Sequence, residues 1–227
     1  MNLNKLTDNN STLKIAVDGE AASGKGTLSK KIAKNYNLYY CQTSIFYRKL
    51  AKVSIDKNID DLSELVNFAS NIENFKNISN KGIYDEKVGS RSSEIASIKE
   101  IRYILNSHQK KILELYDRII MEGRDIGTTI APSADIKLYI TANIETRAQR
   151  RLDQIKHDNS EITFDDVKRK LEIRDKMDKT REFSPLVMPK DAILIDNSNL
   201  QIEEFYLKAI EEISSFLDKN NNSNNIY

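Results

Sequence analysis

Apolar and polar residues follow one another with two different periods along this chain, and the two periods separate strands from helices. Short, nearly continuous apolar runs bounded by polar residues are typical of strands buried on both faces of a sheet. Leu13 to Val17 and Arg118 to Met121 are runs of this kind. The pattern predicts strands at residues 12–17, 39–41, 118–121, 135–140 and 192–195.

Longer segments repeat their apolar residues every three or four positions, which is the period of a helix with one buried face. In residues 60–72, for example, Leu62, Leu65 and Ala69 fall on one face. Residues 82–88 are mixed and flanked by turn residues, and we assign them no regular element. The pattern predicts helices at residues 24–36, 44–53, 60–72, 100–116, 143–156, 163–179 and 202–217.

The predicted strands alternate with the predicted helices. This order favours an α/β fold in which a central parallel sheet carries helices on both faces. At 227 residues, one large domain at residues 13–217 is the simplest organisation. The polar segments at residues 1–12 and 218–227 are expected to be disordered.

Composition excludes several classes of function. The 35 basic and 34 acidic side chains give a formal charge of +1, so nothing in the charge balance favours nucleic acid or membrane as a partner. The single cysteine, Cys41, excludes an intrachain disulfide and fits a reducing compartment. No secretory signal or long apolar run is present. We therefore expect a soluble, cytoplasmic protein. A monomer is a separate expectation, which composition does not establish.

The segment between the first predicted strand and the first predicted helix fits the pattern of a phosphate-binding loop. A Gly-rich turn there aims backbone N–H groups and the positive end of a helix at phosphate oxygens. Lys25 adds a mobile positive charge, and the Thr27 hydroxyl can face Mg²⁺. Three of only seven glycines lie in this loop. It reads Gly19-Glu20-Ala21-Ala22-Ser23-Gly24-Lys25-Gly26-Thr27.

A second polar constellation, Glu122 to Gly127, directly follows a predicted strand. Ligands of parallel sheets bind beyond the carboxyl ends of the strands. Arg124 and Asp125 would therefore lie near the phosphates held by the first loop. A solvated turn with a local ion pair is the alternative interpretation.

The predicted helix at residues 163–179 has a face that changes from apolar to charged. Thr163 followed by Asp166 has the spacing of a capping box. Positions three or four apart share one helix face. The face indicates a helix that leaves the core to line an anionic cleft, although a helix fraying into solvent with ordinary ion pairs fits the same spacing. It consists of Phe164, Val167, Leu171, Arg174, Asp178 and Arg181.

Three arginines, Arg147, Arg150 and Arg151, lie on the helix predicted at residues 143–156. Arginines in this position could clamp the phosphates of a transfer reaction. A basic helix facing solvent explains the spacing equally well.

Over roughly residues 13–217, the chain resembles the bacterial cytidylate kinases, which phosphorylate CMP and dCMP. The resemblance rests on the order and spacing of several segments. These are Val17-Asp18-Gly19 with Gly24-Lys25-Gly26-Thr27, Ile45-Phe46-Tyr47-Arg48, Gly123-Arg124-Asp125-Ile126-Gly127-Thr128, Arg147-Ala148-Gln149-Arg150-Arg151, Arg174-Asp175 with Asp178 and Arg181, and Ser184-Pro185-Leu186.

The resemblance implies a P-loop kinase core with two additions. A monophosphate-binding insertion would occupy about residues 52–99, and a lid about residues 147–185. ATP would bind at residues 19–27 under Arg147 and Arg151. Transfer would be stabilised by Lys25, Arg124, Arg150 and Arg181. The acceptor site would consist of Thr43, Arg48, Ser93, Arg102, Asp125, Arg174, Asp178 and Arg181. Among these, Ser93, Arg102 and Asp178 would read the cytosine edge.

Three departures from the family pattern stand out. The chain has Gln42-Thr43-Ser44 where the family usually has Asp-Ser-Gly, and Glu20-Ala21-Ala22 where the phosphate loop usually has Pro-Ser-Gly. Met177 stands where an arginine is common, which predicts one phosphate contact fewer.

The resemblance implies ATP-dependent phosphorylation of CMP and dCMP with Mg²⁺ as cofactor and small nucleotides as the only partners. Two alternatives remain open from the residues alone. One is a P-loop kinase of another small acceptor, such as UMP, AMP or shikimate. The other is a nucleotide-binding regulator without kinase activity.

Overall fold

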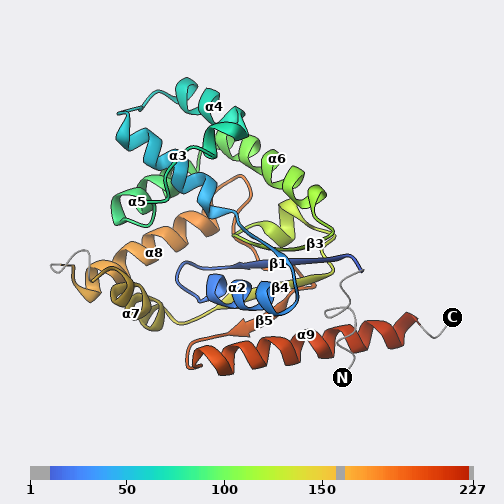
Figure 1. Cartoon of the computed structure of the whole chain (residues 1–227). Helices are drawn as coiled ribbons and strands as arrows, with labels where there is room; N and C mark the ends of the chain where they lie inside the picture. Colours follow the sequence, from blue (N-terminus) through green and yellow to red (C-terminus); the bar gives the residue numbers. More distant parts are fainter. Residues whose placement is uncertain (1–10, 157–161, 225–227) are drawn as a thin grey trace.

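The computed structural model describes residues 11–156 and 162–224, and a five-stranded, fully parallel sheet forms its centre (Figure 1). The strand order is β2-β3-β1-β4-β5, so β1 is the middle strand. This confirms the predicted fold class. The strands are β1 (Leu13–Gly19), β2 (Tyr39–Gln42), β3 (Arg118–Glu122), β4 (Ile136–Thr141) and β5 (Ile193–Asp196).

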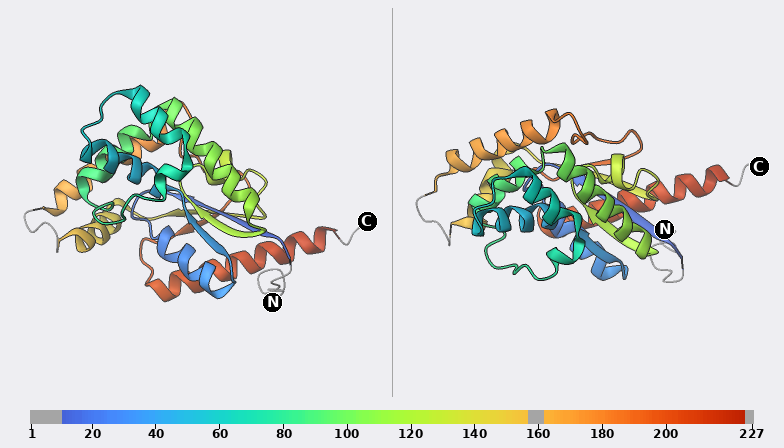
Figure 2. Two further views of the ribbon diagram at one scale, coloured as in Figure 1. Left: turned by 45° about the horizontal axis from the view of Figure 1, so that its top comes forward. Right: turned by 90° about the horizontal axis from the view of Figure 1, so that it is seen from above.

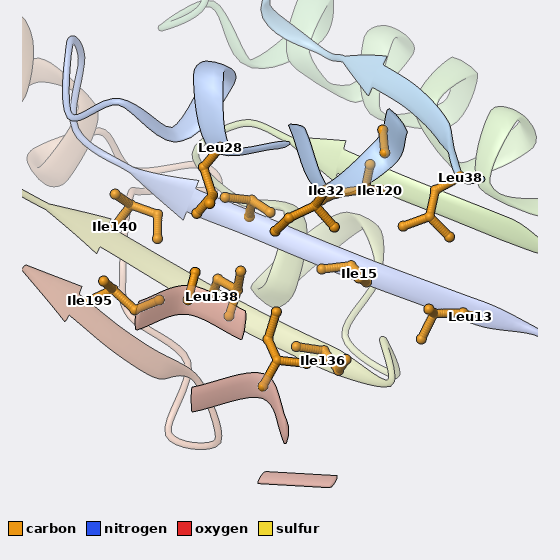
Figure 3. Packing of buried hydrophobic residues seen from close by; sticks show 14 of the residues in the cluster. Leu13, Ile15, Leu28, Ile32, Leu38, Ile120, Ile136, Leu138, Ile140 and Ile195 are labelled. Atoms are coloured by element: carbon orange, nitrogen blue, oxygen red, sulfur yellow. The ribbon is translucent and has the colours of Figure 1, made fainter. Parts of the chain in front are cut away.

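Alternate residues of β1 point to opposite faces of the sheet, as the twofold period of a strand requires. Ile15 and Val17 belong to a cluster that includes residues of helices α2 (Lys25–Asn35) and α9 (Ile202–Asn224). Figure 3 shows Ile15 among the labelled side chains of this cluster. Ala16 belongs to a second cluster on the other face. Because both faces are covered, the strands are mostly apolar, although β1 also contains Lys14 and Asp18.

The other face of the sheet lies beneath a set of helices with a core of its own (Figures 1 and 2). Tyr47, Leu65 and Leu105 are members of this separate cluster. The boundary expected at residue 52 falls inside α3, so the insertion remains a prediction. The elements are α3 (Ser44–Asp56), α4 (Leu62–Ser70), the 3₁₀ turn η1 (Ile72–Phe75), α5 (Glu86–Ile95) and α6 (Lys99–Leu115).

Helices α7 (Ile144–Ile155) and α8 (Phe164–Thr180) pack together beside the phosphate loop. The expected capping box is confirmed, because the Thr163 hydroxyl accepts the N–H of Asp166 and the Asp166 carboxylate accepts the N–H of Thr163. Val167 and Leu171 are buried in a small cluster with Ala21 of the loop. The apolar part of the predicted α8 face therefore lies in the core.

Two predictions about regular structure are wrong. Residues 82–88 are assigned no regular element from their mixed pattern, but residues 86–88 begin α5, because Val88 and Ile95 pack into the helical core. Tertiary packing outweighs weak local propensity here. The end of the chain is helical as far as Asn224, so residues 218–224 are not disordered. No glycine or proline stops α9, and a helix that has already nucleated adds polar residues at small cost.

The sequence pattern predicts no helical turn after β3, but the structure contains one. The π-helical turn η2 (Ile126–Ile130) follows the segment that carries Arg124 and Asp125. Residues 1–10 and 225–227, the remainder of the expected disordered ends, lie outside the described residues. In the described part of the chain, no helix combines the length and apolar character needed to cross a bilayer.

Truncation of the apolar part of the α8 face should destabilise the protein. Leu171 is 7% exposed and belongs to the cluster between α7, α8 and the phosphate loop. We expect Leu171→Ala to lower the free energy of unfolding in urea by about 2–5 kcal/mol, because a cavity replaces the side chain. Ile173→Ala on the same helix is the control, since Ile173 is 55% exposed. Equal losses for the two variants would contradict the burial of this face.

Candidate active site

The carboxyl ends of β1 and β3 bring the phosphate loop and the turn at residues 123–127 together. Each strand ends in a polar turn on the same edge of the sheet, where ligands of such folds bind. Gly24 precedes α2 with a φ of +94°, a backbone conformation that suits glycine. Ala22 has a φ of +59°. This left-handed conformation costs an alanine about 1 kcal/mol.

A cavity of about 480 Å³ opens at this edge between the phosphate loop, α7 and α8. Its lining holds seven basic side chains but only two acidic ones, Glu122 and Asp153. Such an excess of positive charge suits a polyanionic ligand. The basic residues are Lys25, Lys30, Arg48, Arg124, Arg150, Arg151 and Arg174.

Mutual repulsion and burial leave several of these cations poorly stabilised. Burial, followed by the charge of Arg124, lowers the pKa of Lys25 to about 7, although Glu122 opposes the shift. The Lys25 ammonium donates to the backbone carbonyl of Glu20 at 2.9 Å. Burial and then Arg124 lower the pKa of Arg174 to about 10, and burial and then Arg174 lower that of Arg48 to about 9. Bound phosphates would relieve this repulsion.

Asp178 holds the charged part of the α8 face together. One carboxylate oxygen accepts from Arg124 Nε at 2.9 Å, and the other accepts from Arg181 at 2.8 Å. Burial alone would raise the pKa of Asp178, but Arg124, Arg174 and Arg181 outweigh it and lower the pKa to about 2. The carboxylate is therefore charged at neutral pH and fixes the guanidinium groups around it.

A smaller cavity of about 40 Å³ adjoins the first, on the side of α3, α5 and α6. Arg102 and Asp125 form a buried ion pair at its wall, with 2.7 Å between nitrogen and oxygen. Ser93 also lines it. The Thr43 hydroxyl, at the start of α3, donates to the carbonyl of Glu122 at 2.8 Å. The structure thus brings the expected acceptor residues from five separate segments into one place.

A third cavity, of about 220 Å³, lies between α5 and α8. It shares Arg48 with the large cavity, Ser93 with the smaller one and Arg174 with both. Met177 lines this third cavity and does not line the large one. In this structure, position 177 therefore does not face the phosphate loop directly.

Not all of the expected site residues line these cavities. Arg147 is buried beneath the phosphate loop, where it donates to the carbonyls of Ala21 and Ala142 and to Asp175. The structure thus gives it a different place from the cover over ATP that the resemblance implies. Asp178 lines none of these cavities, and its carboxylate accepts hydrogen bonds from Arg124 and Arg181, which do.

Three residues of the predicted phosphate loop, Glu20, Ser23 and Gly19, do not line the large cavity. The Glu20 carboxylate pairs with Lys179 of α8 at 3.2 Å, which places the unexpected acidic residue outside the phosphate region. Ser23 is buried, and its carbonyl accepts from Asn197. Gly19 is the last residue of β1 and leads into the loop.

Arg150 and Arg151 both line the large cavity, but they have different partners. Arg150 donates to the carbonyl of Asn197 at 2.9 Å, and Arg151 pairs with Glu86 of α5 at 2.6 Å. Arg151 therefore links α7 to α5 across the cavity. Both guanidinium groups stand where phosphates held by the loop would be within their reach.

Several residues that line the large cavity lie outside the predicted site, including polar residues at the ends of strands. Asn197 follows β5, and Glu122 is the last residue of β3. The signal for both was a polar residue at the carboxyl end of an apolar strand. Glu122 is 4% exposed, and its Oε2 makes no hydrogen bond to the described residues. A carboxylate oxygen without a partner, in a cavity that Thr27 also lines, fits the oxygen donors that Mg²⁺ prefers.

Known proteins have sequences similar to that of this chain. The family model described as "Cytidylate kinase" matches residues 15–215. The chain is 41% identical over 218 residues to a cytidylate kinase of Rickettsia bellii (strain OSU 85-389), covering 95% of this chain and 97% of that protein. It is 40% identical over 215 residues to a cytidylate kinase of Rickettsia felis (strain ATCC VR-1525 / URRWXCal2), covering 94% and 95%.

Solved structures resemble this one in fold. A gluconokinase from Sinorhizobium meliloti 1021 has a TM-score of 0.54 at 11% identity and covers 93% of this chain and 97% of its own. A shikimate kinase from Bacteroides thetaiotaomicron has a TM-score of 0.51 at 12% identity, with 90% and 99% covered. These structures share the P-loop kinase fold. With a matching family model over most of its length and relatives near 40% identity, the chain belongs to the cytidylate kinase family.

Proposed function

We propose that this protein transfers the γ-phosphoryl group of ATP to the phosphate of CMP and dCMP, forming ADP and CDP or dCDP. One observation supports this most strongly. The large, basic cavity beside the phosphate loop and the smaller cavity with the Arg102–Asp125 pair share Ser44, Gly123, Arg124 and Arg174 in their linings. Donor phosphates in the first and an acceptor phosphate in the second would meet at these residues.

In the proposed reaction, an acceptor phosphate oxygen attacks the γ-phosphorus of ATP while the bond to the β,γ-bridging oxygen breaks. The protein forms no covalent bond in this step. Its part is to align the two phosphates and to stabilise the charge that spreads over the transferred group. Lys25 and Arg150 approach from the donor side, whereas Arg124 and Arg174 lie at the junction of the two cavities. Arg181 lies on the acceptor side.

Thr27 and Glu122 are the residues that would hold Mg²⁺, through a hydroxyl and a carboxylate oxygen. The described residues contain no cluster of three or more acidic, cysteine or histidine side chains for a metal ion. This fits Mg²⁺, which is commonly bound through one or two protein ligands together with substrate phosphates. When bound, the ion would neutralise charge on the phosphate oxygens.

The acceptor base would lie against buried polar groups. Arg102 is 2% exposed and donates to the carbonyl of Ala96 as well as to Asp125. The Ser93 hydroxyl donates to the carbonyl of Gly89 at 3.1 Å and keeps its acceptor capacity. A site with fixed donors and acceptors discriminates strongly against bases that leave them unpaired.

Removal of the lysine of the phosphate loop should abolish transfer. We expect Lys25→Ala to reduce kcat with ATP and CMP by about 10²-fold or more, because a charge aimed at the transferred group is lost. A coupled ADP-release assay measures this. Lys34→Ala is the control, since Lys34 is exposed in the last turn of the same helix. Near-normal turnover of Lys25→Ala would exclude the proposed reaction.

The same assay with different acceptors tests the proposed substrates. CMP and dCMP should be the best acceptors, UMP should be poorer, and purine monophosphates very poor. The reason is that the exocyclic amine and ring edge of cytosine match the buried polar groups. Equal rates with AMP or shikimate would assign the protein to a different acceptor. Nucleotide binding without turnover of any acceptor would indicate a regulator.

Loss of Arg181 should affect the acceptor and leave ATP binding nearly unchanged. Arg181 lines the smaller cavity and is held by Asp178 and by the carbonyl of Ser184. We expect Arg181→Ala to raise the KM for CMP and to lower kcat, with the KM for ATP unchanged. Arg169→Ala, an exposed arginine on α8, is the matched control. An equal rise in both KM values would contradict the assignment of Arg181 to the acceptor side.

A further inference from the structure

Two consecutive residues of β1 hold the two ends of the turn at residues 123–127. The carbonyl of Val17 accepts the N–H of Gly123 at 2.9 Å, where β3 ends. The side chain of the next residue, Asp18, holds the other end of the turn. β1 therefore fixes where the turn leaves the sheet and where it returns.

The Asp18 carboxylate uses both of its oxygens on this turn. Oδ1 accepts the N–H of Ile126 at 2.9 Å, and Oδ2 accepts the N–H of Gly127 at 2.7 Å. These are the first two N–H groups of η2, which have no partner inside the helical turn. Asp18 thus caps η2 from a different strand, and a negative charge is favourable at that end.

This carboxylate is held in an unfavourable environment. Asp18 is 1% exposed, and burial raises its pKa to about 6, although the N–H groups of Gly127 and Ile126 oppose the shift. Asp125 and Arg124 act on it from the turn, and Tyr139 is its electrostatic neighbour on β4. Buried ionisable groups with strongly shifted pKa values occur more often at functional sites than elsewhere.

The two residues between these anchors are Arg124 and Asp125. Arg124 pairs with Asp178 of α8, and Asp125 pairs with Arg102 of α6. On the other side, Asp18 is followed directly by Gly19, where the phosphate loop begins. An added Cβ on Gly19 would meet the carbonyl oxygen of Ile140 at 2.0 Å, so the backbone has little room to move there.

We propose that the Asp18 carboxylate positions Arg124 and Asp125 relative to the phosphate loop by capping the turn that follows them. Asp18 does not line the cavities and is a positioning residue. The proposal rests on the proposed function, because its kinetic consequence concerns the acceptor. A displacement of about 1 Å between reacting groups can lower an enzymatic rate by about 10²-fold.

Asp18→Asn tests this with the smallest change of shape. The amide has one acceptor oxygen and one NH₂ donor, so one of the two N–H groups would face another donor. We expect kcat/KM for CMP to fall by about 10²-fold, while the KM for ATP stays within about a factor of three. The melting temperature should fall by only a few degrees, as after the loss of one hydrogen bond.

Asp135→Asn is the matched control. Asp135 also accepts a backbone N–H of β1, that of Lys14 at 2.8 Å, but at the opposite end of the strand. Its kinetics should equal those of the unmodified protein. The proposal is overturned if Asp18→Asn retains normal acceptor kinetics. It is also overturned if the kinetic constants for CMP and for ATP deteriorate equally, which would indicate a structural role only.

If Asp18→Asn does not fold, an NMR titration of the unmodified protein tests the positioning role of Asp18 instead. In an NMR titration, the amide signals of Ile126 and Gly127 should follow one transition near pH 6, and the side-chain Nε–H of Arg124 should follow it too. An Arg124 signal that stays still while both amides shift would overturn the proposal. An unmodified protein that fails to phosphorylate CMP would instead refute the proposed function and leave the NMR result to decide on Asp18.

Discussion

The active site depends on holding positive charges together against their own repulsion. The cavity at the carboxyl edge of the sheet is lined by far more basic than acidic residues. Burial, followed by repulsion from Arg124, lowers the pKa of both Lys25 and Arg174. Buried carboxylates make the arrangement possible. Asp178 alone holds Arg124 and Arg181. Removal of one partner from such a buried pair typically costs about 3–5 kcal/mol, because the other charge is left uncompensated.

Two of these carboxylates lie on α8, which also carries the cavity-lining cation Arg174. Asp175 pairs with Arg147 beneath the phosphate loop, and Asp178, one turn further, pairs with Arg124 beside the smaller cavity. One helix therefore contacts residues of both the large and the smaller cavity. Its apolar beginning is fixed in the core through Leu171. The packing of the apolar residues of α8 in the core thus fixes the position of Arg174 and Asp178 further along the helix. Functional side chains on a packed helix are held more precisely than side chains on a loop.

The strands, the phosphate loop and most helices could be predicted from the sequence, because each follows from local pattern. Lys25 and the capping box at Thr163 depend only on near neighbours. The rest required tertiary information. Helix α5 exists because Val88 and Ile95 find partners far along the chain. The place of Arg147 beneath the loop depends on Asp175 of another helix, and a spacing rule within one helix contains no signal for it.

The hydrogen bond between Lys25 and the carbonyl of Glu20 also bears on product release. Any nucleotide whose phosphates draw the ammonium away must first break this internal contact. This cost would arise for ATP and for ADP alike whenever their phosphates engage Lys25. It would weaken both complexes and so shorten the residence time of ADP on the loop. The Glu20 carbonyl oxygen, which competes with the nucleotide for Lys25, would thus help the enzyme to release ADP, which differs from ATP by only one phosphate.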